Sequence, residues 1–241
     1  MEGVINLDKP PGLTSARAVD RVKRLLPRGT KIGHAGTLDP FATGVLLLLV
    51  GRATKACERL MDAPKQYETT VKLGASTATD DVESPQIVTE SLPPEPPAAA
   101  DVAAAVRPFV GEILQRPPAF SAMRIDGRRA YDLARQGKPV ELKPRPVRVY
   151  GIDIIEYTWP LLRLRIDCGR GTYIRSIARD LGEALGTGGY LTQLRRTRIG
   201  DYVIDAAVTL ERLQAEGVAP HLQLLHGPPG PYNPPSTDPK G

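Results

Sequence analysis

The chain has 241 residues, 41% of them hydrophobic, and a formal net charge of +5 at pH 7. That length allows one large domain or two small ones around a buried core. The longest apolar run, residues 45–50, is far shorter than the ~20 residues of a membrane-spanning helix. The N-terminus lacks the regions of a signal peptide, and Cys57 and Cys168 form no CxxC pair. We therefore expect a cytoplasmic protein with no membrane partner.

Elements in the first third of the chain are short and sharply bounded. Residues 3–7 predict a strand, and KPPG at 9–12 predicts a turn. A helix is expected after Thr14 or Ser15, because apolar residues then recur at helical spacing. The segment 33–44, GHAGTLDPFATG, is expected to be a loop that leads into a buried strand. A helix and a half-buried strand follow; the predicted ranges are 45–50, 53–61 and 67–73.

The remaining elements alternate irregularly. A proline-rich connector precedes a predicted helix, and residues 117–146 are interpreted as an excursion that forms a binding loop with one short helix. Two antiparallel strands, a helix closed by Gly186, another strand and a short helix follow. The predicted ranges, in order, are 91–99, 101–110, 129–135, 147–157, 161–168, 172–185, 191–199 and 210–214, with a disordered tail at 227–241. This order predicts an α+β fold with a mixed sheet, not a doubly wound one.

The positive charge favours a polyanionic partner, although an ordinary soluble basic surface explains it equally well. The arginines cluster at two places, and the guanidinium fork suits phosphate geometry. These clusters are Arg124, Arg128 and Arg129, and Arg195, Arg196 and Arg198.

Known catalytic motifs are missing, which leaves carboxylates as the candidates. The chain has no GxGxxG, no P-loop, no GxSxG and no metal-binding histidine pattern. Asp39 stands out because Pro40 restricts its backbone, and Gly36 and Gly44 allow a tight bend. An aspartate that merely caps a turn before proline would explain these residues equally well.

Two further groups carry charge in unusual settings. Asp80, Asp81 and Glu83 could bind a cation, but their spacing does not match an EF-hand, and we expect a solvated loop. Arg175 falls in the first turn of a predicted helix, where the helix dipole opposes a cation. That cost predicts a carboxylate partner, with a surface arginine as the alternative.

Six sequence blocks in this order point to a family. They are KPPG, GHAGTLDPFATG, KQYETTVKLG, FSAMRIDGRRAYDLARQG, GTYIRSIARDLG and LTQLRRTRIG. Together they resemble the TruB family of tRNA pseudouridine synthases over about residues 3–225. The resemblance implies a pseudouridine-synthase-like α+β fold, with a mixed, largely antiparallel central sheet, flanking helices and an inserted RNA-binding loop. We expect a catalytic domain at 1–205 and a short extension at 206–226, without the full PUA-type domain that the family usually carries.

The resemblance also implies roles for individual residues. Asp39 would be the catalytic carboxylate, Arg175 its partner, and Tyr67 a residue against the target base that could remove the C5 proton. His34 would stack near the flipped nucleotide, and Lys9 belongs to a block that supports the active-site loop. The full set of implied substrate-binding residues is His34, Tyr67, Tyr173, Leu194, Lys9, Arg124, Arg128, Arg195 and Arg196.

The implied reaction is the isomerisation of uridine to pseudouridine at position 55, in the T loop of tRNA, by base flipping. It changes no redox state and takes up no group, so we expect no cofactor and no metal. The carboxylate would add to C1′ or take the C2′ proton, and either role needs its ionised form. We expect a monomer that acts on the T-stem loop. The alternatives are a tRNA-folding chaperone with the same fold, or a synthase for another structured RNA.

Overall fold

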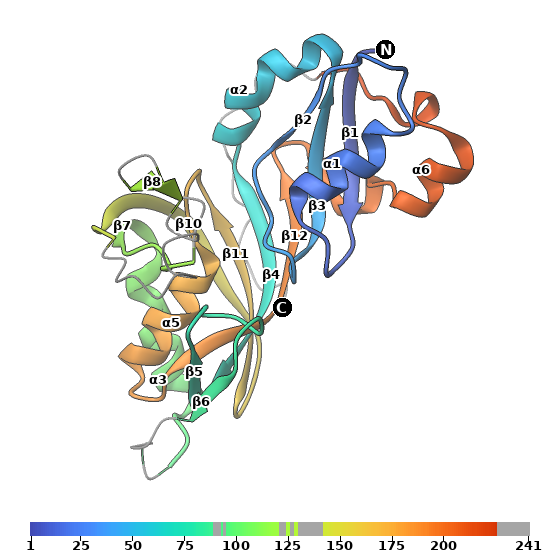
Figure 1. Ribbon diagram of the computed structural model, residues 1–241. Helices are drawn as coiled ribbons and strands as arrows, with labels where there is room; N and C mark the ends of the chain where they lie inside the picture. Colours follow the sequence, from blue (N-terminus) through green and yellow to red (C-terminus); the bar gives the residue numbers. More distant parts are fainter. Residues whose placement is uncertain (89–92, 94, 121–123, 126–127, 130–141, 226–241) are drawn as a thin grey trace, which may run out of the picture. The chain divides into compact units, whose positions relative to one another are not determined.

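The computed structural model describes residues 1–88, 93, 95–120, 124–125, 128–129 and 142–225 (Figure 1). The chain divides into two compact units. Unit 1 comprises Met1–Glu68, Asp167–Arg170 and Leu194–Gly241, and unit 2 comprises Thr69–Ile166 and Gly171–Gln193. Strands β4 (Lys65–Leu73), β11 (Leu161–Cys168) and β12 (Gly189–Ile199) contribute residues to both units. The domain boundaries expected at residues 205 and 226 stay predictions.

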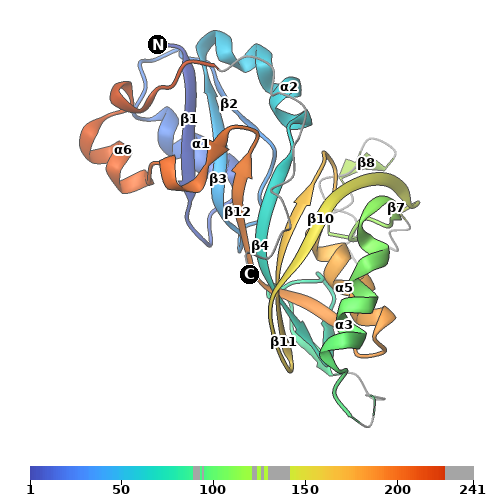
Figure 2. The same cartoon turned by 180° about the vertical axis from the view of Figure 1, so that it is seen from behind.

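Unit 1 is built on a mixed sheet. Strand β1 (Gly3–Lys9) and β2 (Ile32–Ala35) both pair antiparallel with β3 (Thr43–Val50), whereas β12 pairs with β3 in parallel. Helix α1 (Ser15–Lys23) covers one face of these strands in Figures 1 and 2. The other elements of the unit are η1 (Gly51–Ala56), α2 (Cys57–Asp62), β13 (Tyr202–Val203), η3 (Ile204–Ala206), α6 (Leu210–Glu216) and η4 (Ala219–His221).

Unit 2 contains a sheet in which the neighbouring strands are β12, β4, β11, β10 (Arg145–Thr158) and β7 (Gly111–Gln115). Helix α5 (Ile174–Ala184) packs beside α3 (Ala99–Val106). Its buried face includes Ile174, Ile177, Ala178 and Leu181. The smaller elements are β5 (Ala75–Thr77), β6 (Gln86–Val88), η2 (Arg107–Phe109), β8 (Arg124–Ile125) and β9 (Arg128–Arg129).

Local sequence explains the elements of unit 1 that carry the candidate site. The Thr14 side chain accepts the backbone N–H of Arg17 and so caps α1, while Ala18 and Val22 bury its apolar face. Strand β3 is buried from Gly44 to Val50, because neighbouring strands flank it and helices cover the sheet. The predicted α+β fold with a mixed sheet is confirmed, as are the strands at 3–7, 45–50 and 67–73 and the helix after Thr14.

Some expectations were wrong in detail. Residues 32–35 form strand β2, not the start of a loop, because they pair with the C-terminal half of β3. The helix expected at 53–61 is a 3₁₀ turn followed by the short α2, and α3 ends at Val106. The helix expected at 129–135, the tail at 227–241 and much of the excursion at 117–146 lie outside the described residues. Among the residues that are described, no helix has the length and hydropathy needed to cross a membrane.

Strand β3 packs closely against the backbone of β12 at Gly44. Gly44 has a φ of +100°, and a Cβ there would lie 2.2 Å from the Arg196 carbonyl oxygen, whereas Gly29, with a φ of +82°, has open space around it. We expect Gly29→Ala to lower the free energy of unfolding by about 1–2 kcal/mol, the cost of a left-handed residue. Gly44→Ala should cost roughly 3 kcal/mol or more, because strand displacement adds to that strain. Urea unfolding of both variants checks this, and equal losses would contradict it.

Candidate active site

The backbone on both sides of Asp39 is fixed by buried groups from the N-terminal segment. The Ser15 hydroxyl donates to the Leu38 carbonyl (3.1 Å) and accepts the Leu38 N–H (2.9 Å). The Pro40 carbonyl accepts the Gly12 N–H (2.8 Å) and the Lys9 ammonium (3.2 Å). Since Leu38 and Pro40 flank it directly, Asp39 has little freedom to move, and its side chain is partly exposed.

Lys9 is fully buried and stabilises the turn that contains Asp39. Its ammonium donates to the carbonyls of Pro10 (2.9 Å) and Leu13 (2.7 Å) as well as to that of Pro40. An ammonium without carbonyl partners would be costly in such a place. In this position Lys9 is better suited to supporting the Asp39 loop than to contacting RNA.

Arg196 stabilises the Asp39 loop through hydrogen bonds from its side chain to backbone carbonyls. Its side chain is 1% exposed, and it donates to the carbonyls of Val45 (2.7 Å), Gly36 (3.0 Å) and Thr37 (3.4 Å). Two of these acceptors precede Asp39 and one follows it. Among the described residues, no carboxylate lies within 4.0 Å of this guanidinium. We expected Arg196 to bind substrate from a basic surface, but the structure places it inside the protein.

Tyr67, on β4, lies beside Arg196 and within electrostatic range of Asp39. Its hydroxyl is 3.5 Å from a guanidinium nitrogen, and the ring centroid lies 6.0 Å from Cζ. Burial raises the pKa of Tyr67, and the Asp39 carboxylate acts in the same direction, while Arg196 opposes both. The group is therefore a neutral phenol at physiological pH. Leu194 is buried in the same unit, with 7% of its surface exposed.

His34, at the end of β2, is a neutral imidazole. Burial lowers its pKa, and the nearby Arg196 cation lowers it further. The Cys57 thiol donates to the His34 carbonyl at 3.6 Å. A flat, uncharged ring of this kind suits the predicted stacking against a base.

In unit 2, Arg175 has the carboxylate partner that its helix position predicts. It is 4% exposed, lies 3.3 Å from Asp81, and donates to the carbonyls of Thr79 (2.9 Å) and Phe120 (3.0 Å). Asp81 is fully buried, so the prediction of a solvated loop is wrong there; its carboxylate also accepts the Glu83 N–H at 2.9 Å. Asp39 belongs to unit 1, and its pairing with Arg175 stays a prediction.

Tyr173 is the N-cap residue of α5 and is partly exposed. The amide of Gln115, itself buried, accepts the Tyr173 N–H (2.8 Å) and donates to the Tyr173 carbonyl (3.0 Å). The Arg145 guanidinium lies 5.3 Å from the ring centroid of Tyr173. These contacts hold the residue firmly in unit 2.

The second arginine cluster forms no continuous basic surface. Arg195 pairs with Asp8 at 2.8 Å, and Arg198 pairs with Asp167 at 2.8 Å. Arg124 and Arg128 lie in the β8–β9 hairpin of unit 2, and their contact with RNA stays a prediction. Among the described residues, no group of three or more His, Cys, Asp and Glu side chains could hold a metal ion.

Sequence reasoning missed Ser15 as a clamp and Arg196 as a buried anchor. A weak signal existed for Ser15, because it follows KPPG closely and is small and polar. For Arg196 the sequence shows only two adjacent arginines. Successive residues of a strand point to opposite faces of the sheet. Only the contacts that Arg195 and Arg196 make on these two faces show that the two arginines have different roles.

Comparisons with known proteins agree with the sequence blocks. A family model described as TruB family pseudouridylate synthase (N terminal domain) matches residues 23–174. A second, described as tRNA pseudouridylate synthase B C-terminal domain, matches residues 175–221. A protein named tRNA pseudouridine synthase B from Aromatoleum aromaticum is 47% identical, over 93% of this chain and 72% of the relative. One of the same name from Corynebacterium diphtheriae is 44% identical, over 92% and 74%.

Two solved structures resemble the fold. A chain in the crystal structure of a Cbf5–Nop10–Gar1 complex is 32% identical, with a TM-score of 0.69, over 90% of this chain and 54% of that one. A chain from an H/ACA RNP bound to a substrate RNA containing 2′-deoxyuridine is 30% identical, with a TM-score of 0.66. The match covers 90% of this chain and 53% of that one, so this chain spans about half the length of each. Together with the family models, these matches confirm the predicted fold.

The adjacent residues Arg195 and Arg196 of β12 provide two matched variants that test whether Arg196 stabilises the Asp39 loop. Arg196→Met should leave the carbonyls of the Asp39 loop without their donor, and the free energy of unfolding should fall by about 3 kcal/mol or more. Arg195→Met loses a partly exposed ion pair and should cost about 1 kcal/mol or less. Urea unfolding measures both. A similar cost for the two variants would show that the buried contacts do not hold the loop.

Proposed function

The chain belongs to the TruB family of pseudouridylate synthases, and on that premise we propose that it isomerises uridine 55 in the T loop of tRNA to pseudouridine. The observation that carries the proposal is the fixed backbone of Asp39, bonded on one side through Leu38 and on the other through Pro40. Relatives that cover most of this chain are named tRNA pseudouridine synthase B, which supports uridine in tRNA as the substrate. The T loop and position 55 rest on the resemblance of the sequence blocks.

The reaction needs little beyond a well-placed carboxylate. The N1–C1′ bond breaks, the uracil turns, and a C5–C1′ bond forms; C5 then loses a proton and N1 gains one, so the net change is an isomerisation. Asp39 can add to C1′ or remove the C2′ proton, and both roles need its ionised form. Because the side chain is partly exposed while its backbone is held, an extruded nucleotide can meet it without rearrangement of the loop.

Three other residues of unit 1 suit a flipped base. Tyr67 and Leu194 provide aromatic and aliphatic walls for the uracil, and His34 can fill the gap that the base leaves in the RNA stack. Arg196 donates toward the Tyr67 hydroxyl and so orients it, while burial raises the pKa of this phenol and keeps it neutral. A neutral phenol that takes the C5 proton must at the same time pass its own hydroxyl proton to another acceptor, such as water that enters with the RNA.

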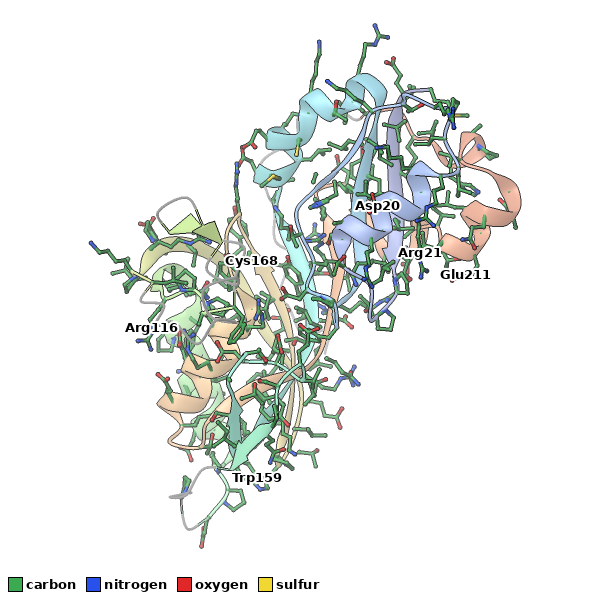
Figure 3. All side chains as sticks on the ribbon, viewed as in Figure 1. Asp20, Arg21, Arg116, Trp159, Cys168 and Glu211 are labelled. Atoms are coloured by element: carbon green, nitrogen blue, oxygen red, sulfur yellow. The ribbon has the colours of Figure 1, made fainter. Side chains whose placement is uncertain are left out.

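Tritium release tests the role of Asp39. With a T-arm hairpin RNA that carries 5-³H-uridine, Asp39→Asn should release tritium at least ~1,000-fold more slowly than the wild type, because the amide can neither add to C1′ nor act as a base. RNA affinity should stay within about threefold, since the isosteric amide preserves the loop. Glu211→Gln, at an exposed acid of α6 (Figure 3), removes the same charge and should match the wild type.

Two results would count against the proposal. Equal tritium release from the wild type and Asp39→Asn would remove Asp39 from the chemistry. RNA binding without tritium release from the wild type would instead favour a tRNA-folding chaperone, which needs the fold but no carboxylate at the ribose.

A further inference from the structure

The segment 17–31 of unit 1 carries an exposed basic surface that neither arginine cluster of the sequence includes. It contains six basic side chains and one acid, Asp20, and all seven are exposed. We call the six the α1 basic face: Arg17, Arg21, Lys23, Arg24, Arg28 and Lys31. Asp20 and Arg21 mark the position of this helix in Figure 3.

These cations lack the partners that arginines have elsewhere in the unit. In the described part of unit 1, none of the six has a carboxylate within 4.0 Å. Other arginines of the same unit are paired: Arg52 with Glu2, Arg170 with Glu58 and Asp62, Arg195 with Asp8, Arg198 with Asp167 and Arg212 with Glu216. Uncompensated like charges repel one another and destabilise a compact protein. A binding role would explain why these six cations remain without carboxylate partners in this part of the chain.

The helix dipole explains only part of the pattern. Cations stabilise the C-terminal turn of a helix, which accounts for Arg21 and Lys23 and for the C-cap residue Arg24. Arg17 lies in the first turn, where the dipole opposes a cation, and Arg28 and Lys31 lie beyond the helix. Capping electrostatics therefore does not explain half of the α1 basic face.

The α1 basic face starts beside the Asp39 loop. Helix α1 begins at Ser15, whose hydroxyl bonds the residue before Asp39, and its nine residues extend about 13 Å from that point. The segment ends at Lys31, directly before β2, where the Lys31 carbonyl accepts the Gly51 N–H at the end of β3 that lies away from the Asp39 loop. A polyanion with one unit at Asp39 would have its neighbouring charges within reach of this face.

We propose that the α1 basic face binds the backbone phosphates of the RNA on either side of the nucleotide delivered to Asp39. The identity of the polyanion as RNA rests on the proposed function, whereas the face itself rests on its unpaired cations. Four of the six are arginines, whose forks bond phosphate oxygens in pairs. Such contacts read no sequence; they set the register in which the RNA lies on the protein.

Two triple variants test the α1 basic face, and each of them removes three positive charges, so their net charges are equal. Arg17→Gln/Arg21→Gln/Arg24→Gln removes three unpaired cations, and the control Arg52→Gln/Arg170→Gln/Arg212→Gln removes three paired ones. The dissociation constant of each for a T-arm hairpin RNA is measured over a range of salt concentrations. The α1 variant should bind at least about tenfold more weakly at low salt, and the slope of log affinity against log salt should fall by about 2, since each lost phosphate contact removes about 0.7–0.9. The control should stay within about twofold of wild type, with an unchanged slope.

Turnover of bound RNA separates this proposal from the proposed function. At saturating RNA the α1 variant should form pseudouridine at close to the wild-type rate, because Asp39 is untouched. Wild-type protein that binds as predicted but forms no pseudouridine would refute the proposed function and leave the face standing. Equal affinities and slopes for the two triple variants would overturn the face, as would a loss of binding to anionic phospholipid vesicles with RNA affinity unchanged. If the α1 triple does not fold, the single variants replace it, each expected to lower the slope by just under 1.

Discussion

The candidate site depends on one constraint, the immobilisation of the two peptide units around Asp39. Ser15 bonds both backbone groups of Leu38, and Lys9 and Gly12 share the carbonyl of Pro40. The groups that hold the turn come from the first fifteen residues, which explains why KPPG and GHAGTLDPFATG occur as separate blocks of one site. A carboxylate held this way needs no reorganisation when charge develops at the ribose, and this lowers the barrier to reaction.

The candidate site also depends on the buried guanidinium of Arg196, which bonds backbone carbonyls of the Asp39 loop. The Arg196 guanidinium is bonded by carbonyl oxygens on both sides of Asp39. Its charge adds to the effect of burial in lowering the pKa of His34, and it opposes the effect of burial on the pKa of Tyr67. Unit 2 uses a different solution for Arg175, which has a buried carboxylate partner in Asp81. In both units an arginine is thus fixed inside the protein by acceptors distant in sequence, and its charge acts on neighbouring groups without making it a surface contact.

Local signals predicted much of this fold and some of the site. The capped helix after Thr14, the apolar run of β3 and the Asp39–Pro40 turn each depend on neighbouring residues, and all three are present. Pairing over long sequence distances could not be predicted. Arg195 and Asp8 are 187 residues apart, and only their ion pair shows that the arginine is not free. The clustered arginines of β12 likewise do not form a basic surface, because Arg195 and Arg198 have carboxylate partners and Arg196 is buried. The cations of the α1 basic face, which are less closely spaced in the sequence, lack such partners among the described residues.

The most direct test of the account is a crystal structure of the protein with a T-arm hairpin RNA whose target uridine carries fluorine at C5, which blocks loss of the hydrogen normally removed there. The account predicts the target nucleotide outside the RNA stack, with a carboxylate oxygen of Asp39 bonded to its sugar or in van der Waals contact with C1′ or C2′. The hydrogen bonds of Leu38 to Ser15 and of Pro40 to Lys9 should be unchanged. A stacked target nucleotide, or an Asp39 carboxylate turned away from the sugar, would contradict the central claim.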